Sequence, residues 1–344
     1  MPDFRHLARM TDDTGMLQFS KLHHPDPQSG YTLDDNARAL MVALFMEEGR
    51  ELALKYARQL ENARRINGSW SNFWLNGEYS PSFDSEDSVG RALLACASGS
   101  SSIWNEVRDL CKSVFTSNWP RVISFESPRG IAYALLAFSR LEKAEWLPVS
   151  RNSIIILLAD RLLSFYKRFR TRQWFWFEQQ MSYCNGILPQ SLFAAFLVSG
   201  KRKYLKAARE SLDFLNSILF QKGYLNIIGN QGWYQRGQIL PLFDQQPVDA
   251  ASIYFACLEA HTALGVSSYL QTAQLAHLWF RGRNIHSLWL YDRESGGCYD
   301  ALTAAGVNLN QGAESLLSLL LCDLQAEIMT REDVSKTWAS SSSR

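Results

Sequence analysis

Neighbouring carboxylates stand out at two points of this 344-residue chain, Asp34-Asp35 and Glu86-Asp87. Most enzymes that hydrolyse glycosidic bonds use two carboxyl groups, one protonated beside the leaving oxygen and one that activates water or attacks the sugar. Two adjacent carboxylates repel each other, which raises one pKa and suits a proton donor. Other carboxylates that could join such a pair follow later in the chain: Glu178, Asp249, Asp292, Asp300 and Glu314.

We expect Asp35 to be catalytic together with Glu314 or Glu86, and which residue is the acid and which the base stays open. Asp34 can cap the helix that follows, and this leaves the carboxylate of Asp35 free for chemistry. Glu314 comes two residues after Gly312, and glycine permits close approach of the backbone to a ligand.

The same residues also have a structural interpretation. Acidic residues in the first turn of a helix satisfy free N–H groups and complement the helix dipole, so Asp34, Asp84 and Asp87 could all be caps. Arg38 and Arg91 follow Asp34 and Asp87 by four residues, which is the spacing of an ordinary helical ion pair. The sequence supports both interpretations.

Tryptophans in loops rich in Gly, Asn and Ser offer flat surfaces for sugar rings. Trp70, Trp74 and Trp233 lie in such loops, although most of the 11 tryptophans are expected to fill the core. Amide side chains both donate and accept hydrogen bonds, which suits hydroxyl recognition, and turns use Asn for local reasons as well. The residues expected to bind substrate are Asp34, Asn36, Arg38, Asp87, Trp70, Trp74, Glu178, Trp233, Gln246, Asp292, Asn310 and Gln311.

Six polar motifs, 40 to 65 residues apart, each precede an almost uncharged segment. Segments that are apolar nearly all round are typical of buried helices, and they lie at 37–46, 92–97, 131–138, 187–198, 248–264 and 313–324. Amphipathic segments with charged outer faces alternate with them, at 52–63, 103–114, 154–165, 204–215 and 269–280. Residues 3–10 can supply a sixth surface helix.

This alternation predicts an all-α (α/α)6 toroid, in which six inner helices form a ring inside six outer helices. We expect a single domain over residues 1–330 and a flexible C-terminal tail over 331–344. Strand signals are weak and local, as at 224–228. The polar residues at the starts of the six inner helices would meet at one end of the ring and form a pocket.

Composition argues against several classes of function. A net charge of +1 without a basic stripe argues against a nucleic-acid partner. No apolar run approaches the roughly 20 residues of a membrane span, and the N-terminus lacks the apolar core of a signal peptide, so we expect a cytoplasmic protein without a membrane partner. The six cysteines are scattered and no cofactor fingerprint is present, so neither a metal nor a cofactor is expected.

The order of the motifs resembles a bacterial family of (α/α)6 toroids, similar to six-hairpin glycosidases, that occurs alone or joined to the C-terminal side of glycosyltransferase domains. The likeness covers roughly residues 4 to 325. The motifs that carry it are Thr11-Asp12-Asp13-Thr14-Gly15, 30–40, Glu86-Asp87-Ser88, Gly90-Arg91-Ala92, Trp176-Phe177-Glu178, 228–234, 243–247, Leu290-Tyr291-Asp292, 296–300 and 308–315.

The resemblance implies a glycosidase-like protein or a part of a glycosyltransferase system. Two positions depart from the pattern expected for the family, because Cys184 stands where an Asp is usual and Phe19 where a His usually follows Gln18. If either expected residue is catalytic, the chain is a weakened enzyme or has kept only binding.

Three hypotheses follow. The first is a glycoside hydrolase that holds an oligosaccharide or polysaccharide in the ring and uses two carboxylates. The second is a non-catalytic glycan-binding accessory partner of a glycosyltransferase. The third, ranked last, is another chemistry of toroids such as sugar epimerisation, which would call for paired histidines in the pocket that the sequence does not indicate.

Overall fold

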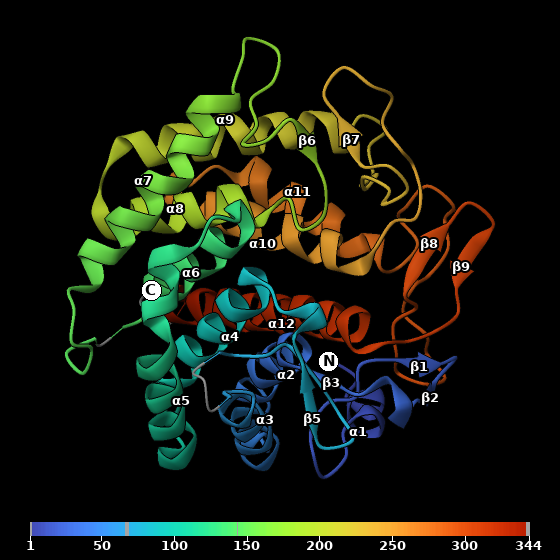
Figure 1. Ribbon diagram of the computed structural model, residues 1–344. Coiled ribbons are helices and arrows are strands. Elements are labelled where there is room, and N and C mark those ends of the chain that lie inside the picture. Colours follow the sequence, from blue (N-terminus) through green and yellow to red (C-terminus); the bar gives the residue numbers. More distant parts are fainter. Residues whose placement is uncertain (1, 66–68, 143, 342–344) are drawn as a thin grey trace.

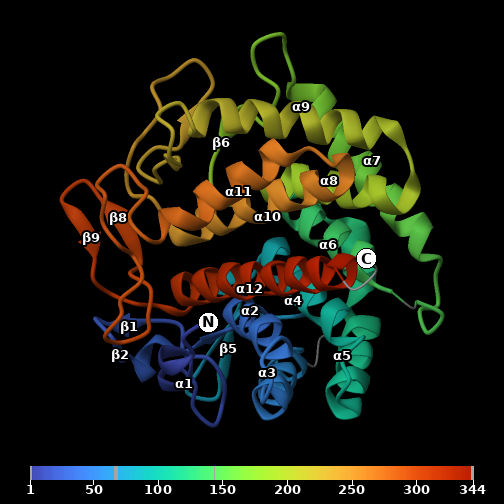
Figure 2. The ribbon, with the colours of Figure 1, turned by 180° about the vertical axis from the view of Figure 1, so that it is seen from behind.

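The computed structural model describes residues 2–65, 69–142 and 144–341, and of residue 82 and residues 332–341 it describes the backbone alone. Six helices form an inner ring in which each contacts the next and the last contacts the first (Figures 1 and 2). They are α2 (Leu33–Leu44), α4 (Glu86–Gly99), α6 (Pro128–Arg140), α8 (Ile187–Ser199), α10 (Pro247–Leu264) and α12 (Ala313–Ser341).

Six further helices surround this ring, and each packs mainly against one inner helix. Five of them follow their inner partner along the chain, while α1 packs against α12 and so joins the two ends of the chain. They are α1 (Arg5–Met10), α3 (Arg50–Asn62), α5 (Asn105–Asn118), α7 (Arg151–Phe169), α9 (Arg202–Leu219) and α11 (Ser267–Trp279). The predicted (α/α)6 toroid is confirmed, including the closure of the ring by residues 3–10.

A serine or threonine hydroxyl, not an aspartate carboxylate, caps the start of α2, α4 and α6. The hydroxyl of Thr32 accepts a hydrogen bond from the N–H of Asp35, and the hydroxyl of Ser85 accepts one from the N–H of Ser88. The expectation that Asp34 or Asp84 caps these helices was wrong. The caps are instead the hydroxyl of Thr32, two residues before Asp34, and that of Ser85, one residue after Asp84. This leaves the carboxylates for other contacts.

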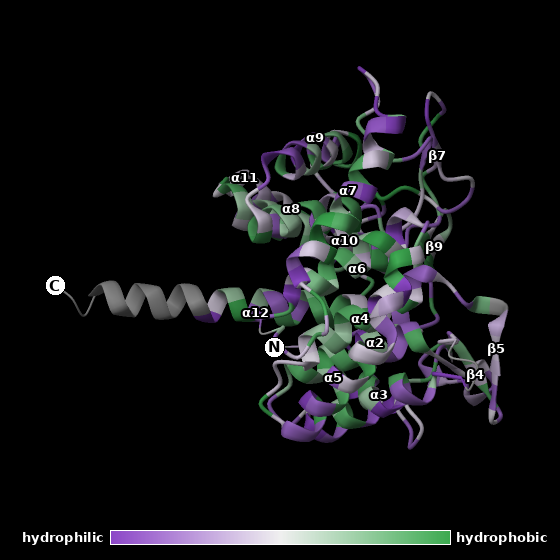
Figure 3. Cartoon of the chain, turned by 60° about the vertical axis from the view of Figure 1, so that its left-hand side comes forward, coloured by the Kyte–Doolittle hydropathy of each residue, from purple (hydrophilic) through white to green (hydrophobic). Residues whose placement is uncertain are grey.

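Short strands lie in the connections that lead from an outer helix to the next inner helix, so they gather on one side of the ring (Figure 3). They form four small antiparallel sheets from β1 (Ser20–Lys21), β2 (His24–Pro25), β3 (Tyr31–Thr32), β4 (Phe73–Leu75), β5 (Glu78–Ser80), β6 (Gln180–Met181), β7 (Tyr234–Gln235), β8 (Ala301–Thr303) and β9 (Gly306–Asn308). The weak strand signal at 224–228 was wrong, because this segment is an irregular loop.

The described parts of the connections also contain three short 3-10 helices: η1 (Pro27–Ser29), η2 (Pro81–Phe83) and η3 (Trp119–Ser124). Within the described chain, no helix is both long and apolar enough to cross a membrane. The helix α12 extends beyond the predicted domain limit at residue 330, and residues 342–344 lie outside the described part of the chain. The flexibility of the tail over 331–344 therefore stays a prediction.

Candidate functional site

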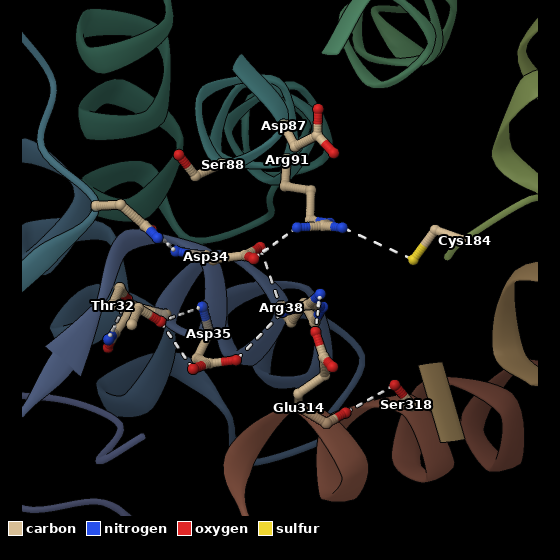
Figure 4. A network of polar contacts seen from close by, with 12 residues as sticks. Thr32, Asp34, Asp35, Arg38, Asp87, Ser88, Arg91, Cys184, Glu314 and Ser318 are labelled. Atoms are coloured by element: carbon tan, nitrogen blue, oxygen red, sulfur yellow. Dashed lines mark hydrogen bonds and ion pairs between the residues drawn. The ribbon is translucent and has the colours of Figure 1, made fainter. Parts of the chain in front are cut away.

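Carboxylates and guanidiniums meet where α2, α4 and α12 begin (Figure 4). Arg38 lies within 3.2 Å of Asp34, 3.1 Å of Asp35 and 2.8 Å of Glu314. Arg91 of α4 contacts the other oxygen of Asp34 at 2.5 Å. Arg38 thus joins the adjacent pair Asp34 and Asp35 to the distant Glu314, and Arg91 shares Asp34 with it.

The local fold around Asp35 commits both of its carboxylate oxygens. The hydroxyl of Thr32 donates to Oδ2 at 2.7 Å, and Arg38 donates to Oδ1 at 3.1 Å. Asp35 is only 4% exposed. Burial raises its pKa to about 7, opposed by the charge of Arg38 and reinforced by the negative charges of Asp34 and Glu314. The structure therefore places Asp35 behind Arg38, where it orients the guanidinium.

Asp34 forms the ion pair that the sequence predicted and one that it did not. Burial opposes its ionisation, but the guanidiniums of Arg38 and Arg91 outweigh burial and lower its pKa. The expected pair between Asp87 and Arg91 was wrong. Arg91 reaches Asp34 on the neighbouring helix, whereas Asp87 accepts hydrogen bonds from the hydroxyls of Ser127 and Tyr183.

Glu314 is the carboxylate of this cluster that solvent reaches, because its side chain is 41% exposed while that of Asp35 is 6% exposed. Its oxygen Oε2 accepts a hydrogen bond from Arg38. The first turn of α12 thus presents a carboxylate whose position is held from inside the ring.

Asp249, in the first turn of α10, is the residue that the sequence named as a carboxylate candidate but did not prefer. Its Oδ1 accepts a hydrogen bond from the N–H of Cys184 at 2.6 Å. Its Oδ2 is buried and has no hydrogen-bond partner among the described residues. Burial raises the pKa of Asp249 to about 7, and the charge of Glu314 adds to the shift. Because Oδ1 receives an N–H, a proton on this group resides on Oδ2.

A second polar group, from α4, α6 and the loop before α8, lies next to the carboxylate cluster. Arg129 is buried, pairs with Glu178 at 2.8 Å and lies over the ring of Tyr183 at 4.8 Å. The hydroxyl of Tyr183 donates to Asp87 at 2.6 Å. The ring of Trp233 lies 6.2 Å from that of Tyr183. The structure therefore brings together three of the predicted binding residues, Asp87, Glu178 and Trp233.

Three predicted site residues serve the fold instead. Asn36 is fully buried, and its amide bonds the backbone of Met16 and Thr32. Trp70 is 2% exposed, and its indole N–H donates to a backbone carbonyl of α3. Glu86 accepts hydrogen bonds from the backbone N–H groups of residues 126 and 127, which anchors the start of α6. All three side chains form hydrogen bonds with backbone groups, and this accounts for their positions.

The remaining predicted binding residues mostly form hydrogen bonds within and between loops. Asp292 accepts hydrogen bonds from the side chains of Ser295 and Gln311. The backbone N–H of Gln311 also donates to the hydroxyl of Ser20. Asn310 accepts a hydrogen bond from the N–H of residue 22. Gln246 caps α10 through its backbone carbonyl and is half-buried. Trp74, in β4, faces the outer helix α3 rather than the centre of the ring.

A cavity of about 270 Å³ lies between the inner helices, and all six contribute to its walls. Arg38, Arg91, Tyr133 and Cys184 line it near the starts of the helices. The rest of the wall is mainly apolar: Met41, Phe45, Leu94, Leu136, Ile187, Val248, Ala251, Phe255, Leu321, Leu324 and Ile328. The two arginines thus stand between an acidic cluster and an apolar interior, and the predicted acidic pocket does not extend into the ring.

Cys184 occupies a position with unusual demands. Its backbone has a positive φ of 46°, a conformation in which Asn and Asp are enriched. Its thiol lies 3.7 Å from Arg91, and burial raises its pKa to about 11. An aspartate here would place a charge against Arg91, so the departure from the expected family pattern falls beside Arg91 and Asp249. Phe19, the other departure, is 54% exposed on its loop.

Comparison with known proteins reveals likeness in structure alone, since no family model and no curated protein matches the sequence. A sugar epimerase from a ruminal bacterium superposes with a TM-score of 0.66 at 14% identity, over 93% of this chain and 95% of that one. The cellobiose 2-epimerase from Spirochaeta thermophila reaches 0.67 at 17% identity, over 92% and 91%. A GH76 α-mannanase from Bacteroides thetaiotaomicron reaches 0.63 at 13% identity, over 95% and 94%.

These likenesses show the fold. The chain shares the (α/α)6 toroid fold with these structures. At such low identity they transfer no residue role and no reaction, so the chemistry has to be argued from this chain's own side chains.

Proposed function

We propose that this toroid is a carbohydrate-active enzyme, a glycoside hydrolase that cleaves an oligosaccharide with Asp249 and Glu314. The observation that carries the proposal is the contrast between these two carboxyl groups. Asp249 is buried with a pKa of about 7 and an unpartnered Oδ2, whereas Glu314 is half-exposed and bonded to a guanidinium. Environments that separate two carboxyl groups in this way assign an acid and a base.

In this mechanism Asp249 is the proton donor, and its Oδ2–H protonates the leaving glycosidic oxygen. Glu314 then attacks the sugar or activates a water molecule, and Arg38 holds Glu314 in place. Asp35 is a positioning residue that acts through Arg38. This differs from the pair expected from sequence, in which Asp35 itself was catalytic and Glu86 was a possible partner.

The aromatic and polar group around Tyr183 and Trp233 would contact the sugar. Flat rings suit the apolar faces of pyranoses, and the carboxylate of Glu178, held by Arg129, can accept from hydroxyl groups. The structural neighbours include an α-mannanase, a cellobiose 2-epimerase and a D-mannose isomerase, so manno- and gluco-configured oligosaccharides are the first substrates to test.

Epimerisation remains the weaker proposal although several neighbours are epimerases. Moving a proton on and off a sugar carbon calls for a base on each side. In the part of the chain that the structure describes, none of the six histidines lines the cavity between the inner helices or forms a hydrogen bond with Asp249 or Glu314. Carboxylates are the ionisable acids and bases of this cluster, which favours hydrolysis.

A glycan-binding accessory partner of a glycosyltransferase is the second candidate, and Cys184 favours it. The thiol stands beside Arg91, whose Nε has no hydrogen-bond partner in the described chain, where an aspartate would supply one. Six free, buried cysteines suit a reducing compartment, so in either role we propose that the protein acts in the cytoplasm.

The test incubates the purified protein with α- and β-linked manno- and gluco-oligosaccharides and separates the products by chromatography. Asp249→Asn and Glu314→Gln should each lower kcat by about 10²–10⁴-fold, the range for loss of a general acid or base. Glu106→Gln, on the outer helix α5, serves as the matched control and should leave kcat unchanged. Unchanged turnover in both site variants would refute the assignment, and binding without cleavage by the native protein would favour the accessory role.

A further inference from the structure

A second concave site lies on the outside of the ring, between the outer helix α3 and the hairpin formed by β4 and β5. This groove has a volume of about 680 Å³. It is lined by Asp13, Thr14, Glu51, Leu54, Lys55, Arg58, Gln59, Asn62, Trp74 and Tyr79. None of these residues belongs to the acidic cluster at the starts of the inner helices, so the groove is a separate feature of the molecule.

Two aromatic rings form one wall of the groove. Trp74 and Tyr79 are directly paired across the β4–β5 hairpin, with ring centroids 6.5 Å apart. Tyr31 of β3 packs against Trp74 from the side, at 5.2 Å, and its hydroxyl is fixed by Asp12. Both groove aromatics are half-buried. The hairpin therefore presents a rigid aromatic surface that stays partly open to solvent.

Polar side chains of α3 face this surface with unused hydrogen-bonding capacity. The side chains of Arg58, Gln59 and Asn62 make no hydrogen bond within the described residues, and neither do the hydroxyl of Tyr79 and the indole N–H of Trp74. Amides both donate and accept, and guanidiniums donate in a plane. Aromatic faces beside planar polar groups match the alternating C–H and O–H surfaces of sugars.

The charges in the groove balance. Asp13 and Glu51 are acidic, Lys55 and Arg58 are basic, and two minus two leaves no net charge. Lys55 is already engaged, since it donates to the backbone carbonyl of Asp12 and lies 3.9 Å from Asp13. A neutral glycan therefore fits this groove better than a phosphorylated or acidic one.

We propose that the groove between α3 and the β4–β5 hairpin is a second carbohydrate site that binds a neutral segment of an oligosaccharide or polysaccharide. Trp74 and Tyr79 stack on sugar rings, and Arg58, Gln59 and Asn62 bind their hydroxyl groups. The choice of carbohydrate rests on the proposed function, but the site is independent of Asp249 and Glu314. Such a site would hold a long chain on the enzyme while another part of it is cut.

The test is the retardation of the protein in native gels that contain soluble mannan or soluble β-glucan. Trp74→Ala should weaken the retardation about tenfold in apparent affinity, which is the loss expected for one stacked ring. The double variant Arg58→Ala/Asn62→Ala changes only exposed side chains of α3 and should also weaken it, which covers the case that Trp74→Ala does not fold. Trp289→Ala, an exposed tryptophan elsewhere, is the matched control.

The outcomes separate this site from the proposed hydrolase. Glu314→Gln should abolish cleavage and keep the retardation, which supports an independent groove. Three results would overturn the groove proposal, even if cleavage is found. The native protein could show no retardation with either glycan. Retardation could survive both groove changes, or it could be lost equally in Trp289→Ala. Retardation that depends on Trp74 without any cleavage would support the groove and reject the hydrolase.

Discussion

Glu314, at the start of α12, accepts a hydrogen bond from Arg38 of α2 at 2.8 Å, and this contact joins the last inner helix to the first. Arg38 in turn is held by Asp35 and Asp34 of its own helix. The half-exposed carboxylate of Glu314 is therefore oriented by the buried Arg38, 276 positions away in the sequence. The contact between the last and the first inner helix thus also positions a carboxylate of the site.

Asp35→Asn should lower kcat/KM about tenfold and leave the shape of its pH profile unchanged, because the amide fills the same space but holds Arg38 less firmly. Arg38 keeps Asp34 and Glu314 as partners, so the fold should persist. Steady-state kinetics between pH 5 and 9, with circular dichroism as the control for folding, provide the measurement. A profile that loses its alkaline limb would instead make Asp35 the proton donor.

The pH dependence of the native enzyme should follow Asp249. Its carboxyl group must be protonated to act as an acid, and its pKa is about 7. Activity should therefore fall as pH rises through about 7, about tenfold for each pH unit above it. Initial rates on a confirmed substrate across this range give the answer, and a flat profile up to pH 9 would exclude Asp249 as the donor.

Asp249→Asn should change stability in a pH-dependent way. The pKa of an aspartate is about 3.9 when unfolded and about 7 in this site, so the folded protein binds the proton more tightly. The resulting stabilisation is complete below about pH 4 and is lost as pH rises through about 7.

Asparagine does not ionise, so the variant should match the native protein at pH 4 and exceed its free energy of unfolding at pH 8 by roughly 2–4 kcal/mol. Urea denaturation at the two pH values checks this. A variant that is less stable at pH 8 would show that the ionised form of Asp249 is favoured by the fold.

Trp233 and Trp70 should respond differently to truncation. Trp233→Ala should raise KM with little change in stability, because its half-buried ring lies beside Tyr183. Trp70→Ala should cost about 3–5 kcal/mol of unfolding free energy, because this ring is buried in the core. Kinetics and thermal denaturation of both variants separate the two roles, and a raised KM in a stable Trp70 variant would contradict the assignment.

The cavity between the inner helices has room for a larger side chain. Ala251→Leu extends into the cavity and should stabilise the protein by about 1 kcal/mol. Ala256→Leu, on the same helix but packed elsewhere in the core, should destabilise it by about 1–3 kcal/mol through overpacking. Chemical denaturation of both proteins provides the comparison, and equal destabilisation would mean that the space at Ala251 is already filled.

The sequence by itself determined the architecture. Segments such as 131–138 and 187–198 carry almost no charge, whereas neighbours such as 204–215 carry charge on one face, and this contrast alone distinguishes inner from outer helices. The periodicity of apolar residues is a local property of each helix, so it can be read from the sequence without knowing which helix packs against it. The sequence also placed polar residues at the starts of the inner helices, which is where the acidic cluster forms.

Only the tertiary structure decided which of these polar residues face one another. Asp34 forms an ion pair with Arg91 on another helix. Glu86 accepts hydrogen bonds from backbone N–H groups just before α6. Trp70 is buried in the core, whereas Trp233 is not. Spacing along one helix cannot reveal contacts between helices, because these depend on helix rotation and on which loop covers each end. Asp35 and Asp249 differ for the same reason. Both carboxylate oxygens of Asp35 have hydrogen-bond partners, whereas Oδ2 of Asp249 has none among the described residues.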